Sequence, residues 1–93
     1  MKFQLVFSRA FKKSFKKVKR SAIFDSEKFE FVLNGLMSGI ELPPQYRDHE
    51  LRGKYSNYRE CHIKPDLLLI YEIDRDFGLI TIVEIGSHSE LFG

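Results

Sequence analysis

The residues of this sequence best suited to chemistry are its three histidines, His49, His62 and His88. Histidine exchanges protons near neutral pH, so this set can supply both a base and an acid to one reaction. Cleavage of RNA through its own 2′-hydroxyl needs such a base and acid together with positive charge, and it needs no metal. Two alternatives stay open, because the same residues could form a zinc site or occupy ordinary surface and core positions.

Other kinds of site have weaker support. The histidines lack the short spacing typical of zinc ligands, and a single cysteine leaves no Cys pair, so we expect no bound metal. Cys61 alternates with His62 along a predicted strand, which directs its thiol toward the core. The six glycines are scattered and form no phosphate-binding loop. We therefore expect neither a cysteine nucleophile nor any cofactor.

Positive charge is concentrated in one segment of a chain whose formal net charge is only +2. Seven basic residues and no acidic residue lie between positions 9 and 20: Arg9, Lys12, Lys13, Lys16, Lys17, Lys19 and Arg20. Lysine and arginine neutralise phosphates without reading base sequence. The segment therefore predicts a surface that binds a polyanion, although a solvated helix face could have the same composition.

The elements that must position these residues follow from hydrophobic spacing and capping signals. A helix with an apolar stripe of phenylalanines is expected from Ser8, its N-cap, to about Arg20. A second helix is expected between the capping residues Asp25 and Gly39. Strands are expected at residues 2–7, around 49–51, and at 58–64, 67–73 and 79–85.

Length and composition indicate one domain spanning residues 1–93. A chain of 93 residues, 43% hydrophobic and 30% charged, can bury a single core. The order of strand, two helices and meander predicts an α+β fold with both helices, as a hairpin, on one face of a roughly four-stranded, mainly antiparallel sheet. The other face is expected to remain free for solvent or a ligand.

Nothing in the sequence indicates a membrane or secretory address. The longest apolar stretch, Leu67 to Tyr71, is far too short to span a bilayer, and the N-terminus lacks the apolar region of a signal peptide. A lone cysteine is typical of a reducing compartment. We therefore expect a cytoplasmic protein.

Three strings of the chain match a known set of motifs in order and spacing: DHELRG at 48–53, YRECHIKPD at 58–66 and GSHSELFG at 86–93. Through them the chain resembles the YafQ branch of the RelE/ParE toxins. The resemblance implies a RelE-like fold and the toxin of a type II toxin–antitoxin pair. Such a toxin is an endoribonuclease, or mRNA interferase, that cuts mRNA in the ribosomal A site.

The resemblance also assigns functional positions. It implies that His49, His62 and Asp66 activate the 2′-hydroxyl and orient the groups around it, and that His88 is the general acid for the 5′-oxygen. Phe92 would stack on or steer a base. Two local interpretations stay open, because turns favour aspartate at positions such as 66 and Phe92 could be a C-terminal core residue.

The chain departs from the family pattern at two positions. Glu84 stands where an arginine is common, four residues before the last histidine, so a positive clamp for the developing phosphate charge is missing. Leu67 stands where a tryptophan can follow the motif aspartate. Neighbouring basic residues could bind substrate in place of that clamp: Arg52, Lys54, Arg59 and Lys64.

The implied partners are a cognate antitoxin of RelB or DinJ type, mRNA in the 70S ribosome, and operator DNA reached through the antitoxin. The basic segment would contact the RNA or ribosome backbone. Because of Glu84, a second hypothesis stays open, in which a weakly catalytic or non-catalytic relative acts through antitoxin pairing and operator binding. A gyrase poison of ParE type would share the fold but not the histidines.

Overall fold

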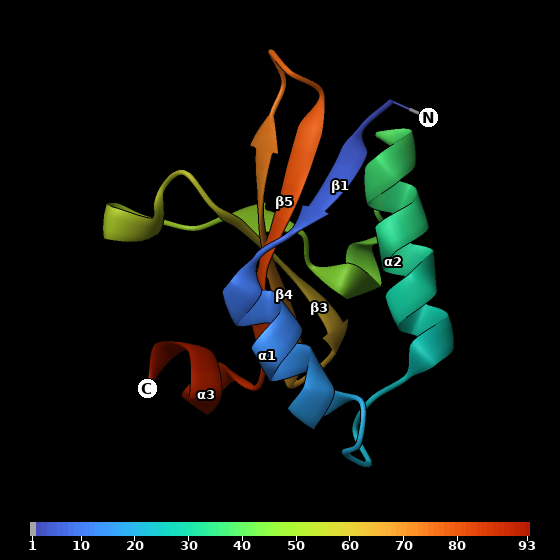
Figure 1. Ribbon diagram of the computed structural model, residues 1–93, viewed down its shortest axis with the longest axis vertical. Helices are drawn as coiled ribbons and strands as arrows, with labels where there is room; N and C mark the ends of the chain where they lie inside the picture. The colour runs from blue at the N-terminus through green and yellow to red at the C-terminus, as the bar shows by residue number, and fades with distance from the viewer. Residues whose placement is uncertain (1) are drawn as a thin grey trace.

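The computed structural model describes residues 2–93, which form a five-stranded sheet, two longer helices and a short C-terminal helix (Figure 1). The strands are β1 (Gln4–Phe7), β2 (His49–Glu50), β3 (Arg59–Lys64), β4 (Leu67–Asp74) and β5 (Leu79–Gly86). The helices are α1 (Arg9–Val18), α2 (Ser26–Ser38) and α3 (His88–Phe92), with single 3-10 turns η1 (Pro44–Tyr46) and η2 (Gly53–Tyr55). The predicted α+β class is confirmed.

The sheet has the strand order β1-β5-β4-β3-β2. The meander β3-β4-β5 and the β2–β3 pair are antiparallel, whereas β1 runs parallel to β5. The sheet is therefore mainly antiparallel, as expected, but has five strands rather than about four. The difference arises because both short outer segments, residues 4–7 and 49–50, pair with the meander and extend it at its two edges.

Both longer helices have the predicted N-caps. The Ser8 hydroxyl oxygen accepts a hydrogen bond from the Phe11 amide at 2.9 Å, and the Asp25 carboxylate accepts one from the Lys28 amide at 3.1 Å. Gly39 ends α2 in the left-handed region, with φ of 69°. Over residues 2–93, no helix has the length and apolarity needed to cross a bilayer.

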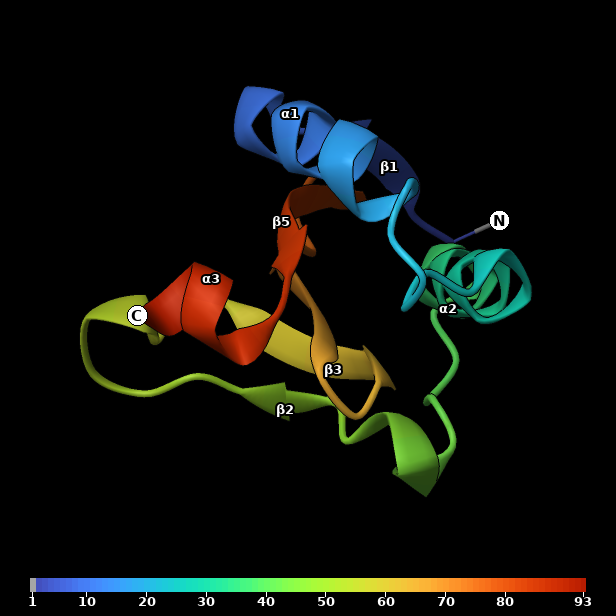
Figure 2. The ribbon, with the colours of Figure 1, turned by 90° about the horizontal axis from the view of Figure 1, so that it is seen from below.

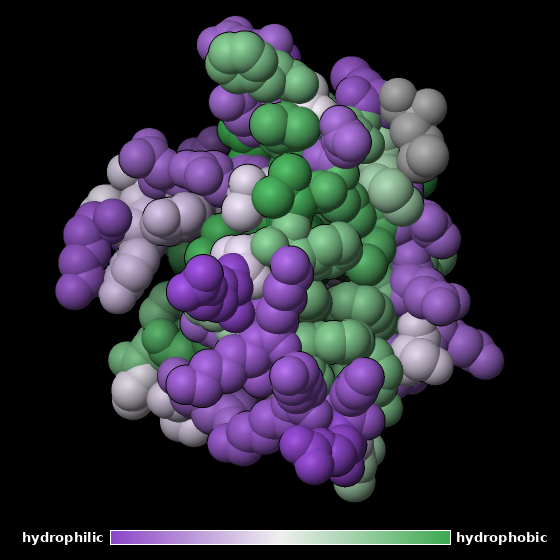
Figure 3. All heavy atoms as spheres, viewed as in Figure 1, coloured by the Kyte–Doolittle hydropathy of each residue, from purple (hydrophilic) through white to green (hydrophobic). Residues whose placement is uncertain are grey.

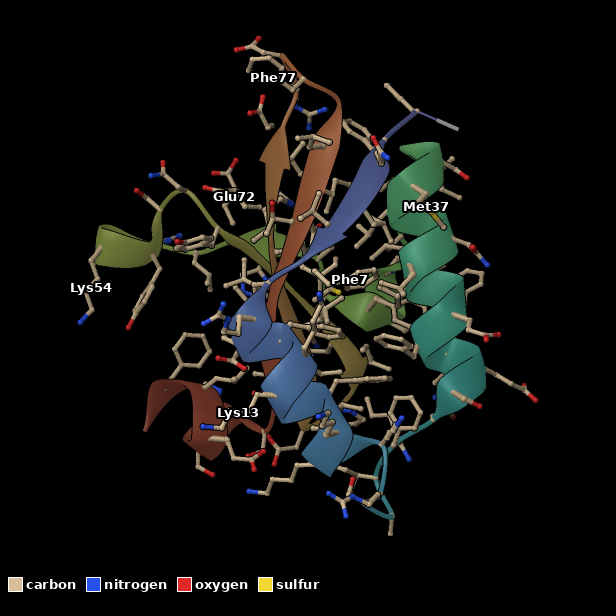
Figure 4. All side chains as sticks on the ribbon, viewed as in Figure 1. Phe7, Lys13, Met37, Lys54, Glu72 and Phe77 are labelled. Carbon is tan, nitrogen blue, oxygen red and sulfur yellow. The ribbon has the colours of Figure 1, made fainter. Side chains whose placement is uncertain are left out.

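Helices α1 and α2 pack on the same face of the sheet, around phenylalanine rings (Figures 1 and 2). The Phe29 ring of α2 lies 5.0 Å from Phe15 and 6.3 Å from Phe11 of α1, measured between centroids. Phe7, which points inward in Figure 4, lies 5.3 Å from Phe11. The sheet completes this core with Cys61, Ile63, Leu67, Leu69, Tyr71, Ile80, Ile82 and Ile85.

The opposite face of the sheet is partly covered, not simply free for solvent or a ligand as expected. Leu68 and Ile70 of β4 lie outside the helix-packed core, yet only 0% and 8% of their surface is exposed. Helix α3, which was not predicted, follows β5 at one end of the sheet (Figure 2). At five residues it is too short to produce a helical hydrophobic period.

Candidate active site

Two of the three histidines lie on the sheet face that points away from α1 and α2. Residues directly opposite each other in an antiparallel pair share a face. His62 of β3 is opposite Leu68 of β4, and Glu60 is opposite Ile70. Strand β2 extends this face, because His49 is opposite Glu60. Pairing of β2, β3 and β4 therefore gathers His49, Glu60 and His62 on the side away from the phenylalanine core.

The Glu60 carboxylate lies between these two histidines. Its Oε1 atom is 3.4 Å from Nε2 of His49 and 3.3 Å from Nε2 of His62, and the two rings are 6.3 Å apart. Glu60 is 5% exposed, so its charge depends on protein partners rather than on water. Sequence reasoning placed Glu60 on the face of His62 but did not single it out; its position two residues from a candidate histidine was the available signal.

Backbone carbonyls orient both rings of this His49–Glu60–His62 cluster. Nδ1 of His49 lies 2.6 Å from the Arg47 carbonyl oxygen, and Nδ1 of His62 lies 3.2 Å from that of Pro65. A carbonyl oxygen only accepts, so each Nδ1 carries the donated hydrogen. The Nε2 atom of each ring then faces the Glu60 carboxylate. This arrangement suits a general base.

His88 comes from a different element, the first turn of α3. Ser87 and Glu90 form a capping box, in which the Glu90 carboxylate accepts from the Ser87 amide at 2.8 Å and the Ser87 hydroxyl accepts from the Glu90 amide at 3.2 Å. The bond from the Ser87 backbone, and then that from Lys17, lowers the pKa of Glu90. These bonds hold the short helix, and with it His88, at the end of β5.

Asp66 attaches α3 to the turn between β3 and β4. Its Oδ1 atom accepts a hydrogen bond from the His88 backbone amide at 2.9 Å. The aspartate therefore does more than stabilise its own turn, because it sets where His88 begins its helix. Within residues 2–93, no ring contact or hydrogen bond joins His88 directly to His49 or His62. The structure thus brings two histidines into contact and positions the third through Asp66.

Phe92 lies at the end of α3 among other rings. Its ring centroid is 5.3 Å from that of His88 and 6.0 Å from that of Tyr55, which it meets edge-on. Phe92 is half-buried and lies outside the core cluster, so its interpretation as a core residue is not supported. Sequence reasoning missed Tyr55, because no pattern in the sequence relates residue 55 to residue 92.

Of the four substrate-binding candidates, Arg59 is the one most engaged within the protein. Its guanidinium lies 3.3 Å from the Asp48 carboxylate, 3.3 Å from the Tyr71 hydroxyl and 3.6 Å from the Glu50 carboxylate. Burial alone would lower the pKa of Arg59, but Tyr71 and the charge of Asp48 outweigh it and raise the pKa. Tyr71 also donates to Asp48. These bonds hold the β2 segment against β3 and β4.

The other three candidates have more freedom. Lys54 projects into solvent from η2 (Figure 4), with its Nζ 5.3 Å from the Tyr55 ring centroid. Arg52 is exposed, whereas Lys64 is half-buried at the end of β3 and shares a cavity with His62. Lys64 is therefore the candidate that the structure places beside a site histidine.

The seven predicted backbone-binding residues all lie on or just after α1 and are all exposed. Figure 3 shows hydrophilic side chains gathered over this helix. Lys17 differs from the rest of the group because its Nζ lies 3.1 Å from the Glu90 carboxylate of α3. The basic surface of α1 therefore borders the helix that carries His88.

Glu84, the departure from the family pattern, lies opposite Ile70 in β4, as Glu60 does from the other side. Two strand spacings separate the backbones of Glu84 and Glu60 by about 10 Å. The Glu84 carboxylate accepts a hydrogen bond from the Ser14 hydroxyl of α1. Glu84 thus adds negative charge two strands from Glu60, and α1 provides its hydrogen-bond donor.

The Cys61 thiol and the possible metal ligands of residues 2–93 were further candidates for a reactive site. Cys61 is fully buried, and burial, followed by the charges of Asp48 and Glu60, raises the pKa of its thiol. Within residues 2–93, no group of three or more His, Cys, Asp and Glu side chains is arranged so that it could hold a metal ion. The His49–Glu60–His62 cluster and His88 offer side chains of the kind used for proton transfer.

Comparisons with known proteins show the family and the fold to which this chain is similar. Residues 3–93 match the model of a family described as YafQ, bacterial toxins of type II toxin–antitoxin systems. The chain is 34% identical over 70 residues to the mRNA interferase toxin YafQ of Escherichia coli K12, covering 74% of each chain. Its fold is similar to that of a metal-bound toxin from Helicobacter pylori, with TM-score 0.89 and 39% identity. The match covers 97% of this chain and 99% of that one.

A second solved structure with this fold is a complex. The chain is similar to the toxin of the DinJ–YafQ complex of Escherichia coli, with TM-score 0.86 and 29% identity over 98% of this chain and 99% of that one. The family match covers nearly the whole chain, including all three histidines and Asp66. The chain therefore belongs to the YafQ family of type II toxin–antitoxin toxins.

Proposed function

We propose that this toxin is an mRNA interferase that cleaves mRNA in the ribosomal A site by metal-independent acid–base catalysis. The observation that carries the proposal is the His49–Glu60–His62 cluster, with the Glu60 carboxylate 3.4 and 3.3 Å from the two Nε2 atoms. The printed name of its Escherichia coli relative, an mRNA interferase toxin, supports the same activity.

The cluster acts as the general base. Its Nε2 and carboxylate atoms accept the proton of the RNA 2′-hydroxyl, whose oxygen then attacks the adjacent phosphorus. A P–O2′ bond forms and the P–O5′ bond breaks, which leaves a 2′,3′-cyclic phosphate and a 5′-hydroxyl. His88, in its imidazolium form, donates the proton that the leaving 5′-oxygen needs. Each of the two proton transfers thus takes place at a named side chain.

The remaining residues position these groups and the RNA. Asp66 holds the start of α3 through the 2.9 Å bond to the His88 amide, and so acts as a positioning residue for the acid. Phe92 offers an aromatic surface beside His88 on which a base can stack. Positive charge for the RNA phosphates comes from Lys64 next to His62, with Arg52 and Lys54 farther out, while α1 contacts the RNA or ribosome backbone.

The proposed partners follow from the same activity. A cognate antitoxin of DinJ type would bind the toxin, as in the DinJ–YafQ complex, and would bring operator DNA into the assembly. A toxin whose substrate is mRNA on 70S ribosomes must work in the cytoplasm. The uneven charge of the chain fits these partners, because α1 is entirely basic in its charged residues.

The test is cleavage mapping in a reconstituted translation system. Wild-type protein should produce cuts that require translating ribosomes, and His88→Ala should lower the rate by about 10²- to 10⁴-fold, as loss of an acid–base group does. Ser89→Ala, which changes the next residue of α3, is the matched control and should cut like wild type. Equal cutting by folded His88→Ala and wild-type protein would contradict the assigned acid.

Glu84 favours a second candidate function, a weakly or non-catalytic toxin that acts through antitoxin pairing and operator binding. Its backbone lies on the same cross-strand row as that of Glu60, its carboxylate accepts from Ser14 of α1, and a basic residue at this position would have offered positive charge to a phosphate. This candidate predicts tight binding to the antitoxin with little or no RNA cleavage. Cleavage by wild-type protein that Glu84→Arg does not accelerate would exclude it, whereas a large gain in rate in Glu84→Arg would show that the acidic residue limits catalysis.

A further inference from the structure

A cavity lies next to the histidine cluster, and two of the basic residues that line it, Lys28 and Arg47, have no role in the function proposed above. It has a volume of about 300 Å³. Its polar lining comes from Lys28 of α2, Gln45 of η1, Arg47 just after η1, and His62 and Lys64 of β3, and Tyr46, Ile63 and Pro65 complete the wall. Three elements that are distant in sequence therefore converge on one side of His62. A volume of this size can hold a phosphate group together with part of a sugar.

The lining of this cavity is suited to an anion. Lys28, Arg47 and Lys64 contribute positive charge, Gln45 adds an amide donor, and no carboxylate is among the lining residues. Within the described residues 2–93, none of these three cations forms an ion pair, whereas Arg59 and Lys17 do. Their donors are thus available to a phosphate from outside the chain.

Arg47 connects the cavity to the catalytic cluster. With φ of 47°, it is the one non-glycine residue of residues 2–93 in the left-handed region. This backbone conformation is sterically unfavourable for a residue with a Cβ atom. Two features occur at this residue: the Arg47 carbonyl accepts from His49 Nδ1 at 2.6 Å, and Arg47 is one of the residues that line the cavity.

The cavity also lies on the side of the β3–β4 turn opposite to α3. In Figures 1 and 2, α2 and the green turn of η1 lie on one side of this turn, and α3 lies on the other. His62 belongs to both the cavity and the cluster, because its ring faces Glu60 at 3.3 Å. An RNA strand that passes His88 and then the cluster would reach the cavity next.

We propose that this cavity binds the RNA phosphodiester adjacent to the one that is cleaved, through Lys28, Arg47 and Lys64. The inference rests on the proposed RNA-cleaving function and adds a subsite to it. It assigns a role to two residues that no motif includes, Lys28 and Arg47. The bound phosphate fixes the register of the strand, so that the scissile group lies between the cluster and His88.

The experiment measures the affinity of short RNA probes that cannot be cleaved. Three trinucleotides with every 2′-hydroxyl methylated are compared, one without a terminal phosphate, one with a 5′-phosphate and one with a 3′-phosphate. In wild-type protein one of the two terminal phosphates should raise affinity by about tenfold, because a charge-assisted contact is gained. If neither phosphate raises affinity, the proposal is overturned.

Two double variants complete the design. Lys28→Gln/Arg47→Asn should abolish the gain; asparagine is chosen at position 47 because it tolerates left-handed backbone and so preserves the carbonyl contact with His49. Lys2→Gln/Arg75→Gln removes the same charge from the N-terminal segment and from the turn between β4 and β5, and it should retain the gain. Both segments lie at the end of the sheet away from the β3–β4 turn (Figure 1). A full gain in the cavity variant, or equal losses in both variants, would overturn the proposal.

Cleavage on ribosomes, measured with the same proteins, separates this inference from the proposed function. The cavity variant should raise KM with little change in kcat, since its residues touch a phosphate that does not react. A wild-type protein that binds the probes through the cavity but cuts no mRNA would refute the nuclease alone. A protein that cuts mRNA while the cavity variant keeps the full phosphate gain would refute the cavity subsite alone.

Discussion

The two faces of the sheet differ in what holds them together. On the face under α1 and α2, aliphatic side chains pack against phenylalanine rings that lie 5.0 to 6.3 Å apart. On the other face, a buried carboxylate lies between two histidines that are themselves oriented by backbone carbonyls. The same strand, β3, contributes Cys61 to the first face and both Glu60 and His62 to the second.

This difference separates stability from activity. The core face needs apolar side chains of about the right volume, so its energy is spread over many contacts. The site face depends on a few polar contacts whose geometry comes from strand register, so one altered atom can abolish its chemistry. Substitutions on the two faces should therefore change different measured quantities.

The largest expected effect on stability is on the core face. Leu69 is fully buried beneath the helices, and Leu69→Ala should lower the free energy of unfolding by about 2–5 kcal/mol through lost burial and a cavity. On the site face, His62→Gln should lower it by less than about 1 kcal/mol while abolishing most cleavage. Urea unfolding measures the free energy of unfolding of each variant. Comparable losses of stability in Leu69→Ala and His62→Gln would contradict the separation of the two faces.

A smaller effect is expected at Asp66, which joins the site face to α3. Asp66→Ala removes the acceptor of the His88 amide and should lower kcat by about tenfold through misplacement of the acid. Asp66→Asn keeps an oxygen acceptor at the same place and should restore most of the rate. Single-turnover cleavage provides the comparison, and equal rates for the alanine and asparagine variants would show that the amide contact is unimportant.

The basic surface of α1 should affect binding more than chemistry. Substituting the exposed Lys12, Lys13 and Lys16 by glutamine should weaken RNA or ribosome binding and reduce its salt dependence, by about 0.7 in the log–log slope for each lost phosphate contact to a single strand. Affinity measured over a range of salt concentrations tests this. An unchanged slope would mean that α1 does not contact the nucleic acid.

The smallest expected effect is the pH dependence of α3. The pKa of Glu90 is lowered by its bonds with Ser87 and Lys17, so the folded state favours the charged carboxylate. The resulting stabilisation is present above the ordinary pKa of a glutamate and is lost as pH falls through the lowered value. The protection factors of the α3 amides, which compare the observed exchange rate with the intrinsic rate at the same pH, should therefore fall at acidic pH. Glu90→Gln should show the lower protection at neutral pH as well.

Much of the fold could be predicted because its signals are local. Ser8, Asp25 and Gly39 set helix ends through their own side chains or backbone, and strand alternation directed Cys61 to the core. The parallel pairing of β1 with β5 could not be predicted, since it depends on contacts between residues some 75 positions apart. Helix α3 was missed because five residues carry no periodic signal.

The site could be predicted only in part. Resemblance to the family identified the histidines, Asp66 and Phe92, but not how they are connected. Glu60 becomes prominent only when register places it opposite His49, and the bond from the His88 amide to Asp66 spans 22 residues. Arg59 has the right charge for a phosphate clamp, but it forms ion pairs with Asp48 and Glu50. The residues next to Arg59 in the sequence do not indicate these pairs.

The most direct test of the central claim compares two glutamates whose backbones lie on one cross-strand row. Glu60→Gln removes a negative charge from the site face, and Glu84→Gln removes one from the contact with Ser14 of α1, each with almost no change in shape. Their mRNA cleavage rates on translating ribosomes are measured together. The account predicts that Glu60→Gln loses about 100-fold or more of the rate, whereas Glu84→Gln equals or exceeds wild type. Equal rates for Glu60→Gln and wild-type protein would contradict the central role of the His49–Glu60–His62 cluster.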